Sequence, residues 1–338
     1  MIANILGTPP ASGVLRPLEV RRDLGRVADL VEYCFADTLD ADGRRYIQQM
    51  RAVAQNPSAL SWVNTLSERV SLPISGFVWE EDGKIVGNLT LIPYHVRGVR
   101  YFLIANVAVH PDYRRRGIAF RLTNRALDQA RQQNIPATWL HVREENAGAI
   151  QLYRSLGFKE RASRTTWMSD RQVGDIHAEK SGSAVNQDAR IRVGPRRSED
   201  WNAQKSWLHQ LYPAELNWHL PLKPAALQPG LRGFLYRSLN DTNIHQWSAW
   251  QAEKLIGVLS WHSSNAYADS LWLASYPEAE DTAAAALLEY SQQHISRRRP
   301  LSLDYPAGRA VQAIQDAGFY KHQTLIWMCI ETAPRIGP

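Results

Sequence analysis

The strongest constraint on the fold is a repeated segment. Residues 140–158, LHVREENAGAIQLYRSLGF, align without gaps with residues 301–319, LSLDYPAGRAVQAIQDAGF, and five of the 19 positions are identical. Each copy then runs into a strand-like segment that ends in Trp-Met, at Trp167-Met168 and at Trp327-Met328. Because both copies share the order strand, helix, Gly-Phe and strand, we expect two copies of one α/β domain.

The length of the chain and one polar stretch set the expected domain boundaries. A chain of 338 residues is long enough for two domains of ordinary size. Residues 171–189, RQVGDIHAEKSGSAVNQDA, carry almost no periodic apolar content, which is typical of a solvated connector. We therefore expect a first domain at 1–170, a linker at 171–189 and a second domain at 190–338.

Hydrophobic periodicity predicts the same element order in both halves. The first half is expected to contain a strand at 14–21, helices at 23–37 and 43–55, a hairpin at 76–94, a strand at 99–111, a helix at 117–134, a strand at 138–142, a helix at 146–158 and a strand at 161–169 that completes its sheet. The second half follows with a strand near 190, a helix at 201–211, a hairpin at 244–261, a strand at 270–276, an Ala-rich helix, a strand at 301–305, a helix and a last strand.

Charge and cysteine content exclude several classes of protein. The net charge is +6, from 39 Lys+Arg against 33 Asp+Glu, and residues 1–170 carry +5 of it (22 against 17). This excess is too small and dispersed to indicate a nucleic-acid partner. Two distant cysteines exclude a disulfide framework and a cysteine zinc site, and they favour a reducing compartment. With no signal peptide and no apolar run near the ~20 residues of a membrane span, we expect a soluble, cytoplasmic protein.

One stretch predicts a site for a phosphorylated ligand. In residues 107–119, VAVHPDYRRRGIA, a strand stops at Pro111, and three arginines and a glycine lead directly into a helix. The first N–H groups of a helix have no intrahelical partner, and the helix dipole places partial positive charge there. Gly117 has no side chain to keep a phosphate from the main chain, and Arg114 to Arg116 add positive charge. The pattern predicts a pyrophosphate cradle.

A second block lies about twenty residues further on. Residues 140–158 read L-x-V-x-x-x-N-x-x-A-x-x-L-Y-x-x-x-G-F, and 107–119 read V-A-V-H-P-x-Y-R-R-R-G-I-A. Together these blocks resemble the GNAT superfamily of acyl-CoA-dependent N-acyltransferases. The resemblance covers about residues 14–168, and the second copy resembles the fold only. It implies two tandem GNAT-like α/β domains, each with a mixed, mostly antiparallel central sheet flanked by helices.

The same resemblance implies a role for each matching residue, with acetyl-CoA as cosubstrate and no metal. Main-chain groups of Val107 and Val109 would pair with the pantetheine arm, and N–H groups near Ala108 would stabilise the oxyanion. Asn146 would hydrogen-bond the pantetheine or cap the helix that it opens. Tyr153 would protonate the leaving thiolate as general acid; a half-buried packing aromatic is the alternative. The pyrophosphate would be bound by Arg114, Arg115, Arg116, Gly117, Ile118 and Ala119.

The expected reaction is direct attack of an amine on the thioester, and the base is not evident. Some family members carry a carboxylate just before the Val-x-Val segment, but this chain has Asn106, which cannot be a base. Deprotonation relayed by water is expected, with Glu80, Glu81 or His141 as weak candidates. A hydrogen-bonded histidine of the sheet is the favoured interpretation of His141. Cys34 is expected in the core.

The second copy has lost the matching residues. Where the first copy has the arginine cradle, the second reads Tyr-Pro-Glu-Ala-Glu-Asp-Thr-Ala at 276–283, and Ala307 and Ile314 replace Asn146 and Tyr153. We expect no coenzyme A site there, because carboxylates repel a pyrophosphate. The leading hypothesis is an acetyl-CoA-dependent N-acetyltransferase with one active site, whose acceptor is an amine of a small molecule or a peptide and lies beside residues 36–75. The alternative is an acyl-CoA-binding sensor or partner-binding module without turnover.

Overall fold

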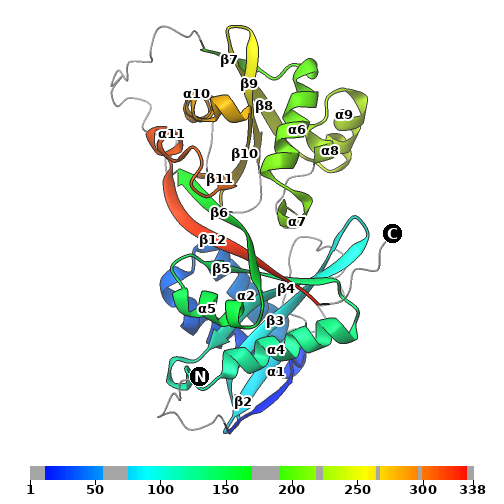
Figure 1. Cartoon of the computed structure of the whole chain (residues 1–338), viewed down its shortest axis with the longest axis vertical. Helices are drawn as coiled ribbons and strands as arrows, with labels where there is room; N and C mark the ends of the chain where they lie inside the picture. The colour runs from blue at the N-terminus through cyan, green and yellow to red at the C-terminus, as the bar shows by residue number, and fades with distance from the viewer. Residues whose placement is uncertain are drawn as a thin grey trace. The chain divides into compact units, whose positions relative to one another are not determined.

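The computed structural model describes residues 12–55, 75–169, 191–217, 224–263, 267–295 and 299–332 (Figure 1). The expected linker at 171–189 lies outside these ranges. The chain divides into two compact units. Unit 1 comprises Met1–Arg161 together with Trp327–Pro338, and unit 2 comprises Ala162–Ile326. Each unit is described separately below.

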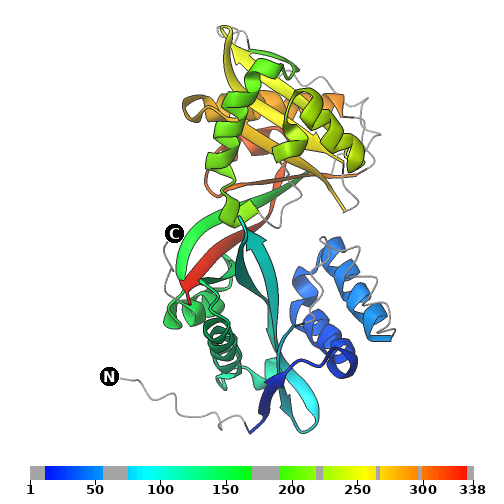
Figure 2. The same ribbon diagram turned by 90° about the vertical axis from the view of Figure 1, so that its right-hand side faces the viewer.

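Unit 1 is a mixed sheet with helices on both faces. Its strands are hydrogen-bonded in the order β1-β2-β3-β4-β5, followed by the end of β12 (Tyr320–Glu331), and all pairs from β1 to β4 are antiparallel. Figure 2 shows the blue helices α1 and α2 on one face and the green helices α4 and α5 on the other. The elements are β1 (Val14–Pro17), α1 (Val20–Phe35), η1 (Ala36–Thr38), α2 (Ala41–Gln55), β2 (Gly76–Glu81), β3 (Lys84–Val96), β4 (Val99–Val109), η3 (Pro111–Tyr113), α4 (Ile118–Gln132), β5 (Ala137–Arg143) and α5 (Ala147–Ser155).

Two close contacts fix the helices on this sheet. Leu24, Val27 and Val31 recur on one side of α1 and are buried against Ile47 and Met50 of α2. On the opposite face, a Cβ on Gly87 of β3 would lie 2.8 Å from Cγ2 of Ile118 in α4. Only glycine allows this approach, so the first turn of α4 packs directly on the sheet.

Unit 2 repeats the pattern of unit 1. Its strands follow the order β12-β6-β11-β10-β9-β8-β7, and β10 with β11 forms a parallel pair, as β4 with β5 does in unit 1. The expected duplication and the mostly antiparallel α/β sheet are therefore confirmed. The elements are β6 (Lys159–Ser169), β7 (Ile191–Pro195), η4 (Ser198–Asp200), α6 (Trp201–Leu211), α7 (Ala214–Asn217), α8 (Pro224–Leu227), α9 (Gly230–Leu239), β8 (Ile244–Gln251), β9 (Lys254–His262), β10 (Asp269–Ser275), η5 (Pro277–Ala279), α10 (Glu280–His294), β11 (Leu301–Pro306) and α11 (Val311–Asp316).

The last strands of the two repeats differ from the expectation. Residues 161–169 were expected to complete the first sheet, but Arg164–Ser169 of β6 pair antiparallel with Leu301–Pro306 of β11 in unit 2. Unit 1 is completed by the end of the chain instead, where the N–H of Thr332 donates to the carbonyl of Pro136 over 3.0 Å. Because the two repeats have similar strand patterns, the last strand of either repeat fits the edge of either sheet.

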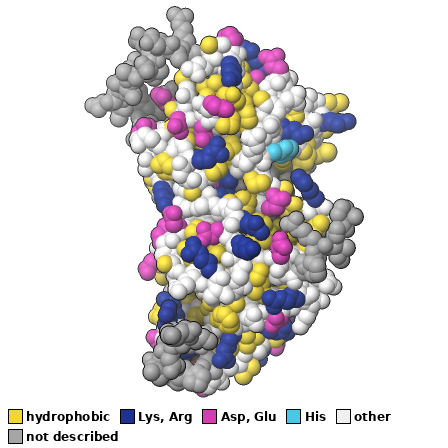
Figure 3. All heavy atoms as spheres, viewed as in Figure 1, with side chains coloured by type: hydrophobic (Ala, Val, Ile, Leu, Met, Phe, Trp, Pro, Cys, Tyr) yellow, Lys and Arg dark blue, Asp and Glu magenta, His cyan; other side chains and the backbone are white. Residues whose placement is uncertain are grey.

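Charged side chains of the two signs are mixed on the face in Figure 3. Lys and Arg side chains (dark blue) are interspersed there with Asp and Glu (magenta), in keeping with the small net charge of +6. Within the described ranges, no helix is long and apolar enough to cross a membrane.

The exchange of last strands predicts an unusual location for a destabilising substitution. Trp167 belongs to the first repeat by sequence but is 3% exposed in the core of unit 2. Trp167→Ala is expected to destabilise unit 2 by about 3–5 kcal/mol, because it leaves a cavity in that core. Hydrogen exchange by mass spectrometry should show faster exchange in β9 to β11 and unchanged exchange in β2 to β4. The reverse pattern would contradict the strand assignment.

Candidate active site

The site begins where two parallel strands separate. β4 and β5 are paired only at Phe102, Leu103 and Ile104, opposite Thr138, Trp139 and Leu140. Residues 105–109 and 141–143 continue these strands, and within these fully described strands they form no further pairs with each other. Carboxyl ends of parallel strands that diverge leave a crevice in which ligands bind. The predicted residues Val107, Ala108 and Val109 lie on the β4 side of this gap.

A bulge in β4 coincides with the start of the gap. Asn106 has φ of +50°, and the pairing with β3 shifts between Asn88 and Thr90. Nδ2 of Asn88 donates to the carbonyl of Asn106 over 2.9 Å, and Nδ2 of Asn106 donates to the hydroxyl of Tyr46 over 2.9 Å. Burial raises the pKa of Tyr46 to about 12, so this hydroxyl is neutral. Bulges re-aim the residues that follow, here the 107–109 segment.

The predicted cradle is an open helix N-terminus. Gly117 is the N-cap of α4, with a left-handed φ of +77°, and no side chain caps the helix. A Cβ built on Gly117 would meet no atom within 4 Å, so the space in front of the first turn is free. Ile118 itself is 2% exposed, and its side chain is in the core. Ile118 can therefore contribute only main-chain groups to an anion, as the cradle requires.

The three arginines of the cradle have different surroundings. Nε of Arg114 donates to the carbonyl of Val109 over 3.1 Å. Arg116 is held by Glu81 at 3.4 Å and by the carbonyl of Asp112 at 3.0 Å, and its guanidinium lies 4.8 Å from the ring centre of Tyr113. Arg115 is exposed, with φ of +64°, and makes no contact of this kind with a described residue. Arg115 is thus the arginine most available to a ligand.

Asn146 caps a helix, one of its two expected roles. Its Oδ1 accepts from the N–H of Ala149 over 3.1 Å at the start of α5. The side chain is exposed, and its Nδ2 makes no hydrogen bond to a described residue. The cap therefore leaves the amide donor for the second expected role, a hydrogen bond to the pantetheine.

Tyr153 is buried but keeps its hydroxyl unused. It is 6% exposed and packs edge-on against Phe158, with ring centres 5.9 Å apart. Burial raises the pKa of Tyr153 above its ordinary value, so the phenol keeps its proton at neutral pH. No described residue hydrogen-bonds the hydroxyl. The ring packs as the alternative interpretation expects, and the retained proton is what a general acid requires.

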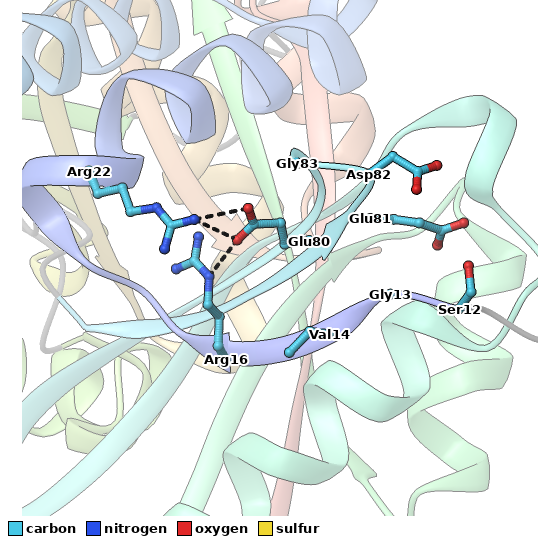
Figure 4. A pocket seen from close by; sticks show the side chains of 9 residues that line it. All are labelled: Ser12, Gly13, Val14, Arg16, Arg22, Glu80, Glu81, Asp82 and Gly83. Atoms are coloured by element: carbon cyan, nitrogen blue, oxygen red, sulfur yellow. Dashed lines mark hydrogen bonds and ion pairs between the residues drawn. The ribbon is translucent and has the colours of Figure 1, made fainter.

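Both glutamates proposed as bases have other partners. Glu80 binds Arg16 at 2.7 Å and Arg22 at 2.9 Å (Figure 4), and the Arg16 hydrogen bond holds the pKa of Glu80 below its ordinary value. In the same view Glu81 points away from Glu80, and Glu81 pairs with Arg116. The structure thus assigns both carboxylates to ion pairs.

His141 is exposed rather than satisfied within the sheet, which corrects the favoured interpretation. Its neighbours Leu140 and Val142 are buried on the other face of β5. His141 is the first residue after the last β4–β5 pair, and its ring centre lies 5.2 Å from that of Trp327. A crowded environment that desolvates the ring lowers the pKa of His141 to about 4. At this pKa the ring is uncharged at neutral pH.

Cys34, which was expected in the core, is half-buried near the end of α1 and packs against the core of unit 1. Its Sγ lies 3.5 Å from the carbonyl of Val109. Burial raises the pKa of the Cys34 thiol, which makes it a poor nucleophile. Among the described residues, no group of His, Cys, Asp and Glu could hold a metal ion.

Unit 2 fills the equivalent gap with its own side chains. β10 and β11 also separate after three pairs, at Leu271 and Leu303. Beyond that point the hydroxyls of Ser275 and Tyr305 lie 3.3 Å apart, and Tyr305 donates to the carboxylate of Glu280, the first residue of α10. Nε of Arg309 also donates to Glu280, over 3.0 Å. The first residue of α10 is therefore a carboxylate held by a tyrosine and an arginine.

Comparison with known proteins finds similarity to one family in part of unit 1. Residues 46–158 match the acetyltransferase (GNAT) family. The chain is 42% identical over 62 residues to the ribosomal protein bS18-alanine N-acetyltransferase of Escherichia coli, which is 18% of this chain and 42% of that protein. It is 33% identical over 122 residues to the mycothiol acetyltransferase of Thermobifida fusca, which is 33% of this chain and 31% of that protein. The chain thus spans less than half the length of these relatives.

A solved structure extends the likeness in fold to the whole chain. A GCN5-related N-acetyltransferase from Sphaerobacter thermophilus superposes with a TM-score of 0.55 and 14% identity, covering 98% of this chain and 99% of that one. At this identity the likeness concerns the fold alone.

The two roles of Asn146 can be separated by substitution. Asn146→Ala is expected to lower the free energy of unfolding of unit 1 by about 1 kcal/mol, because the cap of α5 is lost. Asn146→Asp keeps an oxygen cap but lacks the amide donor, so stability should be retained while acetyl-CoA binds more weakly. Urea unfolding and calorimetry measure the two effects. Unchanged acetyl-CoA affinity in Asn146→Asp would leave Asn146 with the cap alone.

The open gap, the uncapped helix N-terminus and the family match all fall in one segment of unit 1. The segment that matches the acetyltransferase (GNAT) family, residues 46–158, lies within unit 1.

Proposed function

We propose that this chain is an acetyl-CoA-dependent N-acetyltransferase with one active site, in unit 1. The observation that carries the proposal is the open N-terminus of α4 at Gly117 beside the gap between β4 and β5. An extended thioester with a pyrophosphate at one end suits a strand edge that leads to an anion site. The matched segment 46–158 contains all the residues proposed for this site.

The cosubstrate would be bound mainly by main-chain groups. The N–H groups at Ile118 and Ala119 and the free side chain of Arg115 would bind the pyrophosphate. Arg114 and Arg116 would add positive charge from their fixed positions. The main chain of Val107 would pair with the pantetheine. The carbonyl of Val109 already accepts a hydrogen bond from Arg114. Unless that hydrogen bond breaks, Val109 would therefore offer only its N–H group to the pantetheine.

The reaction would be a direct transfer. The lone pair of the amine attacks the thioester carbonyl, and N–H groups near Ala108 stabilise the oxyanion. When the intermediate collapses, the C–S bond breaks, its electron pair goes to sulfur, and Tyr153 gives the thiolate its proton. The new amide loses one proton to solvent, and Tyr153 recovers one. The acetyl group is thereby transferred with no covalent enzyme intermediate.

No carboxylate of the described site serves as base, so the amine would react in its neutral form after losing a proton to water. Asn106 carries an amide, and Glu80 and Glu81 are held in ion pairs. With a pKa near 4, His141 is a weak base, but its neutral ring can accept a hydrogen bond. His141 would therefore orient the amine or a water molecule.

The acceptor would be an amine of a small molecule or a peptide. One relative is named for an alanine of a ribosomal protein, and another is named for mycothiol. Nη2 of Arg143 at the end of β5 donates to the carbonyl of Thr38 over 3.1 Å. This contact joins one side of the gap to the segment 36–75 predicted to line the acceptor, of which 56–74 lie outside the described residues.

The second repeat would bind no coenzyme A. Its gap is bridged by Ser275 and Tyr305, and the carboxylate of Glu280, the first residue of α10, would repel a pyrophosphate. By sequence, we infer a catalytic domain at 1–170 and a degenerate domain at 190–338. The last strand of each repeat pairs within the sheet of the other unit. The two free cysteines favour a cytoplasmic location.

Tyr153→Phe tests the chemistry. The ring would still pack against Phe158, so acetyl-CoA should bind with unchanged affinity, while kcat falls about 100-fold because the thiolate leaves unprotonated. Thiol release from acetyl-CoA with a panel of amines measures kcat, and calorimetry measures binding.

Two results would contradict parts of this proposal. A full rate for Tyr153→Phe at saturating substrate would remove the general-acid role. Acetyl-CoA binding by the unmodified chain without thiol release from any amine would favour the sensor.

A further inference from the structure

The last described residues of the chain are built into unit 1. Oγ1 of Thr332 donates to the carbonyl of Ile135 over 2.7 Å, and its N–H donates to the carbonyl of Pro136 over 3.0 Å. Thr332 is 9% exposed and Trp327 is 2% exposed. The segment 327–332 is thus part of the fold of unit 1, although it ends the second repeat in sequence.

This segment brings an indole against the site. The ring centre of Trp327 lies 6.5 Å from that of Trp139, edge-on, and 5.2 Å from that of His141. Trp139 and His141 lie two residues apart on β5, so their side chains project from the same face of the strand. Between them, the last β4–β5 pair ends at Leu140. The indole of Trp327 therefore packs against His141, the first residue of β5 beyond the paired segment.

We propose that Trp327 is a positioning residue for the active site of unit 1, acting through His141. The inference rests on the proposed acetyltransferase function. The imidazole of His141 is exposed and packs against the buried indole of Trp327, which would fix the orientation of the ring. The second repeat, which has no cosubstrate site of its own, thereby contributes a functional element to the first. This gives the degenerate copy a role in catalysis.

The chain offers a matched control for this proposal. Trp167 occupies the equivalent Trp-Met position in the first repeat, is 3% exposed, and lies in the core of unit 2. Removing either indole creates a cavity of similar size, but only Trp327→Ala should disturb His141. Trp327→Phe retains a ring at the contact and should restore most of the activity.

Kinetics with the most reactive amine of the panel provide the first test. Trp327→Ala should lower kcat/KM about tenfold or more, because small displacements of positioning groups are costly. Trp167→Ala should leave kcat/KM nearly unchanged. In a His141→Ala background the effect of Trp327→Ala should disappear, since the two residues act as one unit. Equal effects of the two tryptophan variants, or a full effect of Trp327→Ala without His141, would overturn the proposal.

A readout independent of turnover separates this proposal from the proposed function. The His141 ring protons should shift in the NMR spectrum of Trp327→Ala, because the indole ring current is lost, and they should stay unchanged in Trp167→Ala. An unchanged His141 resonance in Trp327→Ala would overturn the positioning role, whatever the enzyme does. A chain that shows this shift but never releases thiol would instead refute the acetyltransferase function.

Discussion

The hydrogen-bonded pairing between β4 and β5 stops after Ile104 and Leu140, and the proposed chemistry depends on that break. While two strands are paired, their facing N–H and C=O groups are occupied; once they diverge, the same groups can bind an extended ligand. The bulge at Asn106 starts the divergence on the β4 side. The chain then turns through Pro111 into α4, which brings the N–H groups of its first turn to the same side of the sheet. One interruption of the ladder thus leaves an unpaired strand edge beside an open helix N-terminus.

In unit 2, the parallel strands β10 and β11 separate in the same way, but different side chains lie beyond the last pair. Its parallel pair also ends after three residues, but Tyr305 and Ser275 lie across the opening, and Glu280 supplies the negative charge that the helix N-terminus favours. The backbone pattern survives without the site. We infer that a duplicated fold can keep its sheet while a few side chains remove its ligand site.

Sequence patterns predicted the local features well and the strand partners poorly. The helix start at Gly117, the cap at Asn146 and the burial of Leu140 and Val142 each follow from residues near in sequence. The exchange of last strands could not be predicted, because the segments that end in Trp167 and Trp327 are similar and fit either sheet edge. The ion pairs of Glu80 and Glu81 were also missed, since their partners Arg16 and Arg116 lie 64 and 35 residues away in sequence. The ring contact between His141 and Trp327 could not be predicted either, because Trp327 comes from the far end of the chain.

The central claim is that a single gap, in unit 1, receives the cosubstrate. Calorimetric titration of the full chain with acetyl-CoA tests it most directly, with Gly117→Asp as the variant that places a carboxylate at the cradle. The claim predicts one molecule bound per chain and no binding to Gly117→Asp. Two molecules per chain, or undiminished binding to Gly117→Asp, would contradict it.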